Sequence, residues 1–271
     1  MAKVVKRSEV AVVEHAPVAN VDVLQMDDDE IALMQEYEGA GLSSKSEDNL
    51  VPIITLLQDL SPQAKARDPE YVEGAVPGSI FIKSTNLLIS GEEGFLFQPC
   101  SFRTAVVEWV PRDSGGGLVA SYETMPTDAV SYINEKGKSL WKSAAGNDLV
   151  ETRYHSGYLE YGDIRMPAVL SFSSTGHSVS KGWMTQMNNV TVPTPNGPKK
   201  APSWFKKYKI TSRLKQKNNQ EWFIFDVVPY EWVQDKNQRE DGRALFEAFE
   251  EGTKTIDHET EPSELDKDVP F

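Results

Sequence analysis

The residues best suited to chemistry in this sequence form a basic segment in which aromatic residues stand among the cations. The segment runs from residue 199 to residue 217, and the first acidic residue after it is Glu221. Its basic residues are Lys199, Lys200, Lys206, Lys207, Lys209, Arg213, Lys215 and Lys217, and its aromatic residues are Trp204, Phe205 and Tyr208. Cations follow the phosphates of a nucleic-acid strand, while aromatic rings stack on bases of any identity. The segment therefore predicts a surface for single-stranded nucleic acid, contacted by all of these residues except Tyr208.

An extended strand over residues 205–214 would divide the segment between two faces, because side chains alternate along a strand. One face would carry Phe205, Lys207, Lys209, Thr211 and Arg213, and the other Lys206, Tyr208, Ile210, Ser212 and Leu214. We expect the first face to contact nucleic acid and the second to lie against the core. A solvated β-hairpin with buried rings explains the same pattern, and this alternative stays open. Trp222 and Trp232 flank an apolar stretch and are expected in the core, whereas Trp204, beside lysines, is expected at the nucleic acid.

A second feature with the chemistry of a binding site is the C-terminus, where an acidic segment ends in Asp266-Lys267-Asp268-Val269-Pro270-Phe271. Pro270 restricts the backbone and lowers the entropy that is lost on binding. The Phe271 ring can fill an apolar pocket while its α-carboxylate meets a lysine or arginine. This pattern predicts a partner-binding tip made of Asp266, Asp268, Val269, Pro270 and Phe271. A solubilising acidic tail is the alternative, although such tails rarely finish on Pro-Phe.

The last four residues match a known type of chain end: Asp268, an aliphatic residue in Val269, then Pro270 and Phe271. In this the chain resembles bacterial single-stranded-DNA-binding proteins and the tailed-phage proteins with the same role. Lys267 departs from their pattern, since an acid is usual at that position, and this bears on the strength of partner binding. The resemblance implies an oligonucleotide-binding (OB) fold, a small Greek-key barrel with insertions in phage members. It also implies a role in DNA replication, recombination or repair, with proteins of those processes bound by the tip.

The charge of the chain is distributed unevenly, and this removes an objection to nucleic-acid binding. The net charge is −13, but residues 1–48 and residues 239–271 each carry 4 basic and 11 acidic residues. The middle, residues 49–238, keeps 20 of the 28 basic and 19 of the 41 acidic residues, a net charge of +1. The acidity therefore belongs to the two ends, and the overall isoelectric point says little about the core.

Several classes of protein are disfavoured by what the sequence lacks. One cysteine, Cys100, and four scattered histidines are too few for a disulfide framework or a Cys/His zinc site. Neither a signal-peptide pattern nor a run of about 18 apolar residues is found, so we expect a cytoplasmic protein without a membrane partner. No phosphate-binding or dinucleotide fingerprint occurs, and we expect neither a cofactor nor an enzyme. His155 is more typical of a packed histidine than of a catalytic one, and Glu160 with Asp163 is a weak basis for a metal nuclease.

The element pattern predicts a mainly β fold of the α+β type, an OB-like Greek-key barrel with inserted helices and loops. Strands are expected at residues 51–57, 79–84, 94–98, 101–110, 158–161, 168–173, 206–214 and 222–228, with helices at 128–135, 179–187 and 243–250. Ser174 or Thr175 is expected to cap the second helix. The predicted organisation is an acidic N-terminal arm (1–48) with a short helical turn at 31–34, a nucleic-acid-binding core (49–238), and a short helix with an acidic interaction tail (239–271).

One mechanism joins the basic segment to the acidic tail. We expect the tail to compete with DNA for the basic surface, so that bound DNA frees Phe271 for partners. Removal of residues 252–271 should then tighten DNA binding, most visibly at low salt. A strand-annealing recombination protein that forms oligomers, or a non-enzymatic virion or scaffold protein, remains an alternative, and a homo-oligomer is compatible with each.

Overall fold

The computed structural model describes residues 27–37, 50–111, 114, 116–134, 137, 139–217 and 220–258. The chain divides into two compact units, residues 1–43 and residues 44–271. In the first unit, helix α1 (Asp28–Glu36) begins at a capping box. The Asp27 side chain accepts from the backbone N–H of Glu30, and the Glu30 side chain accepts from the N–H of Asp27. The helix has nine residues and begins at this box, so it is longer than the short helical turn expected at residues 31–34.

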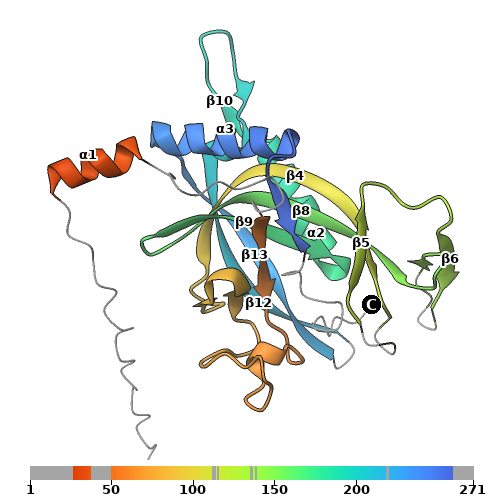
Figure 1. Cartoon of the computed structure of the whole chain (residues 1–271). Helices are drawn as coiled ribbons and strands as arrows, with labels where there is room; N and C mark the ends of the chain where they lie inside the picture. Colours follow the sequence, from red (N-terminus) through yellow and green to blue (C-terminus); the bar gives the residue numbers. More distant parts are fainter. Residues whose placement is uncertain are drawn as a thin grey trace, which may run out of the picture. The chain divides into compact units, whose positions relative to one another are not determined.

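The second unit is mainly β, and its principal sheet curls into a half-barrel (Figure 1). The strands along the sheet, in spatial order, are β13 (Gln220–Trp232), β12 (Lys206–Lys217), β4 (Phe95–Trp109), β8 (Asp148–Tyr161), β9 (Ile164–Ser173), β1 (Leu50–Leu56), β2 (Ile80–Ile82) and β3 (Leu87–Ile89). The pairs from β13 to β9 are antiparallel, whereas β1 runs parallel to β9.

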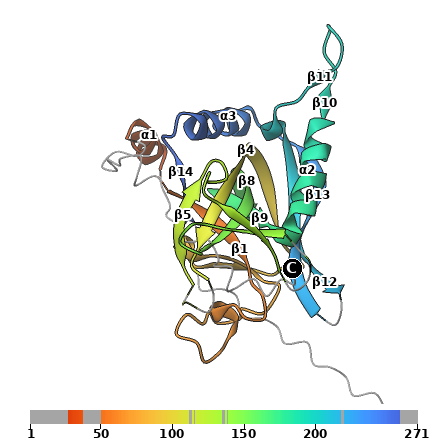
Figure 2. The same cartoon turned by 90° about the vertical axis from the view of Figure 1, so that its right-hand side faces the viewer.

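Shorter elements extend this sheet at its sides. β14 (Thr255–Asp257) pairs with β1, β5 (Leu118–Tyr122) with β4, and the hairpin of β6 (Val130–Ile133) and β7 (Ser139–Lys142) with β8. A separate hairpin of β10 (Thr191–Val192) and β11 (Lys199–Lys200) projects from the end of helix α2 (His177–Asn188) (Figure 2). Helix α3 (Lys236–Glu250) follows β13.

The concave side of the half-barrel holds the larger core, which α2 closes by contributing Trp183. The Trp183 ring lies 5.9 Å from the ring of Phe97, 6.2 Å from that of Phe172 and 5.4 Å from that of Tyr208, all edge-to-face. His155 stacks on the same indole at 4.3 Å and shares a 2.8 Å hydrogen bond with a serine of α2. Burial lowers the pKa of His155 to about 3, which identifies it as the packed, neutral histidine that was expected.

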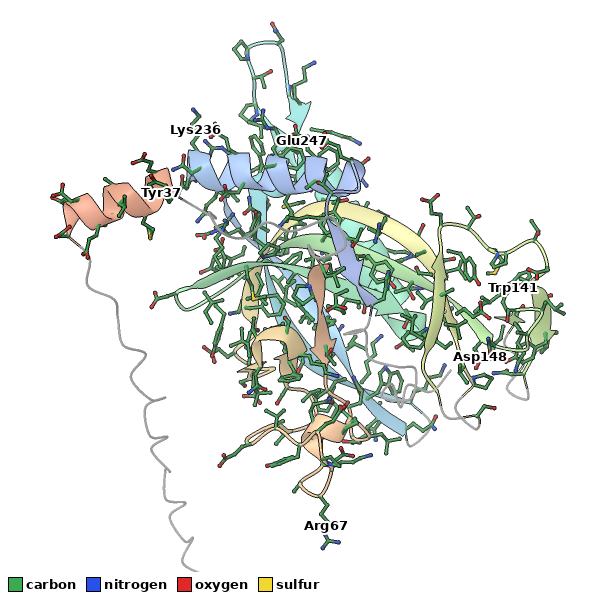
Figure 3. The ribbon with its side chains drawn as sticks, in the orientation of Figure 1. Tyr37, Arg67, Trp141, Asp148, Lys236 and Glu247 are labelled. Atoms are coloured by element: carbon green, nitrogen blue, oxygen red, sulfur yellow. The ribbon has the colours of Figure 1, made fainter. Side chains whose placement is uncertain are left out.

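A second core forms on the opposite side of the sheet, under α3 and β14. Leu245 and Phe249 of α3 and Ile256 of β14 are buried there against Ile53 and Val169. Lys236 and Glu247 lie on the side of α3 that points away from the strands (Figure 3). The helix expected at residues 243–250 thus begins at residue 236, and the boundary expected near residue 239 falls inside it. The compact unit extends through β14, because that strand completes the core.

The Gln58 side chain helps to join the two ends of the half-barrel sheet. Gln58 follows β1, and its carboxamide Nε2 donates to the backbone oxygen of Phe223 in β13 at 3.1 Å. The backbone N–H of Phe223 donates in return to Oε1 of Gln58 at 2.9 Å. The amide thus imitates a neighbouring strand, and it connects β1 with β13 where the described strands form no backbone ladder.

Three local expectations differ from the structure. The described residues 128–134 of the helix expected at 128–135 form no helix: Val130–Ile133 is strand β6, because its β-branched and aromatic residues pair with β7. The strands expected at 94–98 and 101–110 are one strand, β4, with a bulge between Pro99 and Ser101. Helix α2 covers the predicted 179–187, but Gly176 is its N-cap and no side chain caps it, because residues 174–176 form a 3-10 turn.

Candidate nucleic-acid interface

The inner face of β12 confirms part of the alternation predicted for the basic segment. Tyr208 and Ile210 are buried in the larger core, and the surrounding apolar groups raise the pKa of Tyr208 to about 12. Leu214 was expected in this core but is 50% exposed. The reason is that β12 pairs with β4 only from Tyr208 to Ile210. Beyond that point the hairpin of β12 and β13 extends past the half-barrel, and Leu214 has no core beneath it.

The outward face of β12 presents cations together with neighbours from β13. Lys209 is half-buried and lies opposite Val228, and Thr211 lies opposite Asp226. Arg213 is exposed, and its Nη2 atom lies 3.3 Å from Oδ1 of Asp226. Both side chains of that ion pair are well exposed, so the pair is weak and the guanidinium stays available to a ligand.

The aromatic part of this surface comes from β13 rather than from the residues before β12. Tyr230 is 57% exposed and Trp232 is 38% exposed, and the ammonium of Lys206 lies 5.0 Å from the centre of the Trp232 ring. The expectation that Trp232 lies in the core was wrong, whereas Trp222 is buried as expected. The register shifts between Lys206 and Tyr208, where β13 takes one residue more than β12, and this places Lys206 opposite Trp232.

We call the resulting surface the basic-aromatic strip. It consists of Lys206, Lys209, Arg213, Lys215, Val228, Tyr230 and Trp232. β12 has 12 residues, and a strand of that length is about 40 Å long. Tyr230 was missed from the sequence. The sequence contained a signal for Tyr230, because Val228, Tyr230 and Trp232 stand at every second position of β13, after the buried part of that strand has ended.

Lys207 differs from the other cations of the segment, because it is only 7% exposed. Its Nζ atom lies 2.6 Å from Oε2 of Glu160 in β8 and 3.8 Å from Oε1 of Glu231 in β13. The surface position expected for Lys207 is therefore not observed. One carboxylate from β13 and one from β8, which reaches across β4, hold the ammonium against the sheet, and this satisfies its charge internally.

The same carboxylate, Glu160, belongs to a polar network that we call the α3 clamp: Gln98, Tyr158, Glu160, Arg165, Lys207 and Asp241. The Arg165 guanidinium donates to Asp241 at 2.8 Å, to Gln98 at 3.1 Å and to Glu160 at 3.3 Å. It also lies 3.9 Å from the centre of the Tyr158 ring. Glu160 is thus a partner of two cations, and the described residues hold no cluster of three or more groups able to ligate a metal.

Trp204 and Phe205 lie in a 3-10 turn, Ser203–Phe205, where both are half-buried near α3. The Trp204 ring lies 5.4 Å from the ring of Phe246, and a Cβ atom added at Gly242 would meet the Cβ of Trp204 at 2.6 Å. The Arg239 guanidinium lies 5.7 Å from the Phe205 ring. These contacts pack the turn against α3, and the backbone N–H of Val233 donates to the backbone oxygen of Phe205 at 2.9 Å.

The remaining basic residues lie at the two ends of the segment. Lys199 and Lys200 are exposed on β11 of the projecting hairpin, and Lys217 is exposed at the far end of β12 (Figure 2). The structure therefore does not gather all eight cations at one place but spreads them along β12 and the hairpin. The tip residues Asp266, Asp268, Val269, Pro270 and Phe271 lie outside the described residues, as do residues 1–26.

Comparisons with known proteins give one match. The family described as Pam3 phage gp34-like protein matches residues 25–255, which is most of the chain. No curated protein and no solved structure matches. Within the described residues, no helix has both the length and the apolar character that a membrane span requires.

Proposed function

This chain belongs to the family of Pam3 phage gp34-like proteins, and from that premise we propose that it binds and protects single-stranded DNA during phage DNA replication, recombination or repair. The observation that carries the proposal is the basic-aromatic strip. Lys209, Arg213 and Lys215 alternate along one face of β12, and the exposed rings of Tyr230 and Trp232 lie on its partner strand β13, with Lys206 opposite Trp232. Phosphates would follow the cations, and bases of any identity would stack on the rings.

We also propose that the half-barrel is an OB-type fold. The strands β4, β8 and β9 pair as neighbours, with the short strands β5, β6 and β7 inserted between β4 and β8, and β12 returns after α2 to lie beside β4. The spatial order β12-β4-β8-β9 follows the Greek-key rule, in which the fourth strand returns beside the first. β13 then adds a fifth strand beside β12. This order supports the barrel topology that the C-terminal resemblance implied.

The position of α3 supports binding on β12 and β13 rather than elsewhere on the sheet. In OB folds, oligonucleotides usually lie across the second and third strands, whose counterparts here would be β8 and β9. One side of those strands packs on the larger core, and Leu245 and Phe249 of α3 cover the other side. The strip on β12 and β13 is the neighbouring surface on which cations and exposed rings meet.

The test is a titration with oligo(dT) and with duplex DNA at two salt concentrations, followed by tryptophan fluorescence. Trp183 and Trp222 are buried, so a Trp141→Phe background makes Trp232 the most exposed reporter among the described tryptophans. The expected result is quenching by oligo(dT), a weak response to duplex and a steep dependence on salt. Absence of binding to oligo(dT) at low salt, also after removal of residues 259–271, would exclude the proposal. Rapid annealing of complementary strands would favour a recombination protein instead.

The acidic tail is proposed to compete with DNA for the strip and to recruit replication or recombination proteins through its tip. The deletion that tests this must begin later than residue 252. Residues 255–257 form β14, and Ile256 is buried in the core under α3. Removal of residues 259–271 keeps that strand, and it should raise the affinity for oligo(dT) at low salt while leaving the melting temperature unchanged.

A further inference from the structure

A groove lies between α2 and the strands β12 and β13, with a cavity volume of about 210 Å³. Helix α2 runs along β13 in this region (Figure 2). The helix contributes Ser178, Gly182 and Gln186 to the lining, and the strands contribute Arg213, Lys215 and Asp226. Two residues of the basic-aromatic strip, Arg213 and Lys215, thus also line the groove, so that the groove continues the strip.

The charge of the lining favours an anion. Arg213 and Lys215 contribute two positive charges and Asp226 contributes one negative charge. Arg213 pairs with Asp226 at 3.3 Å, and both side chains of this ion pair are well exposed. Because an exposed ion pair of this kind is weak, the Arg213 guanidinium can leave Asp226 and bind a stronger acceptor such as a phosphate. A metal cation would meet two ammonium or guanidinium groups and one carboxylate, which is an unfavourable set of ligands.

Gly182 is the second observation that points to a ligand. It lies in the middle of α2, where glycine destabilises a helix relative to alanine. Packing does not require it, because a Cβ atom added at Gly182 would meet nothing within 4 Å. Glycine does, however, allow a ligand to approach the helix backbone closely. The exposed space above Gly182 opens onto the groove. Close approach of a ligand therefore explains a glycine at this position, whereas the packing of the fold does not.

We propose that the groove binds one phosphodiester unit of the bound single strand, with the phosphate at Arg213 and Lys215 and the sugar-phosphate backbone against Gly182. The inference rests on the proposed function and deepens it, because it extends the DNA path from Trp232 along β12 to the side of α2. The strip would hold bases at its aromatic end and backbone at its groove end. Free phosphate carries the same chemistry, so the experiment must separate the two sources.

The test uses Gly182→Ala and the larger, uncharged Gly182→Gln, with Thr185→Ala as the matched control. Thr185 is exposed on the same helix and does not line the groove, so its replacement raises helix propensity without entering the site. Neither alanine variant should lower the melting temperature. The Gly182 variants should bind oligo(dT) more weakly, with the larger loss for Gln. The slope of log affinity against log salt should become shallower by about 0.7, which is the contribution of one phosphate on a single strand.

The outcomes distinguish the failure of this inference from failure of the proposed function. Oligo(dT) binding that is unchanged in both Gly182 variants but weakened in Trp232→Ala would overturn the groove and leave the function standing. Wild-type protein that binds no oligo(dT) would overturn both. Inorganic phosphate that displaces oligo(dT) from the wild type beyond the effect of chloride at equal ionic strength, and not from Gly182→Gln, would assign the groove to free phosphate and overturn the strand path.

Discussion

The basic-aromatic strip and the α3 clamp use the same residue types on one sheet for opposite purposes. In the strip, Lys209 and Arg213 stand among threonine, valine and exposed rings, with one weakly held acid nearby. In the clamp, Lys207 is 7% exposed beside Glu160, and Arg165 donates to three partners at once. The count of cations is therefore a poor guide to binding. Whether a cation can bind phosphate depends on whether carboxylates from other strands of the sheet lie next to it.

The two regions also depend on each other. Asp241 of α3 and Glu160 of β8 both accept from Arg165, so the clamp holds the helix over the sheet. The helix then covers β8, while β12 and β13 extend beyond it as a hairpin. A protein with the clamp intact would direct DNA to the strip because the neighbouring face is already occupied. The variants below test whether one region stabilises the fold while the other binds the ligand.

The largest effect is expected from Arg165→Ala, which removes the centre of the clamp. Its side chain is 25% exposed, and its loss leaves Glu160 and Asp241 without their shared partner. We expect the free energy of unfolding to fall by about 2–4 kcal/mol, as measured by urea denaturation. Arg243→Ala is the control, because Arg243 makes an exposed pair with Glu247 and should change stability by less than about 0.5 kcal/mol. Equal losses in the two variants would contradict the clamp.

Next in size is the loss of an exposed ring from the strip. Trp232→Ala and Tyr230→Ala should each weaken oligo(dT) binding by about 1–3 kcal/mol, the usual contribution of one stacked base. Unfolding should change little, because both side chains are more than one-third exposed. Tyr71→Ala provides the comparison, since Tyr71 is 40% exposed in the connection between β1 and β2, outside the strip. Fluorescence anisotropy with labelled oligo(dT) measures all three, and a loss in Tyr71→Ala equal to that in Trp232→Ala would remove the strip as the site.

Sequence reasoning succeeded where the pattern was local and failed where it depended on register between distant strands. The alternation of β12 was predictable because Tyr208 and Ile210 stand two apart in a run of β-forming residues. The burial of Lys207 was not, since its partner Glu160 is 47 residues away and reaches it across β4. The position of Trp232 likewise depends on its pairing with Lys206 and on the register shift beside that pair, where β13 takes one residue more than β12.

The helix expected at residues 128–135 failed for the same reason. Val130 and Tyr132 pair with Lys142 and Leu140 of β7. The segment is too short for its own sequence to determine its secondary structure, and pairing with β7 makes it a strand. By contrast, α2 was predicted almost in full because its apolar residues recur at helical spacing. Local propensity thus predicted the helix that lines the groove, whereas the strip could be recognised only once the pairing of β12 with β13 was known.

A smaller effect should separate the lysines of the two regions. Lys209→Ala removes a strip cation, so the slope of log affinity against log salt should become shallower by about 0.7, with little change in stability. Lys207→Ala removes a buried partner of Glu160 and should lower stability while leaving that salt slope unchanged. Titrations with oligo(dT) at four or more salt concentrations give the slopes. A shallower slope in Lys207→Ala would mean that DNA displaces Glu160 from Lys207, and it would merge the two regions into one surface.

The smallest effect concerns the acids, whose replacement should change the affinity for DNA in one region and the stability in the other. Asp226→Asn keeps the shape of the strip but removes the charge that competes with phosphate for Arg213, so oligo(dT) affinity should rise by about twofold, in keeping with an exposed pair. Glu160→Gln makes the same chemical change in the clamp, where it should lower stability and leave affinity unchanged. Weaker DNA binding in Asp226→Asn would show that the carboxylate positions Arg213 for the ligand. Asp226 would then support the binding site as Glu160 and Asp241 support the fold, and the two regions would differ only in how exposed their charged side chains are.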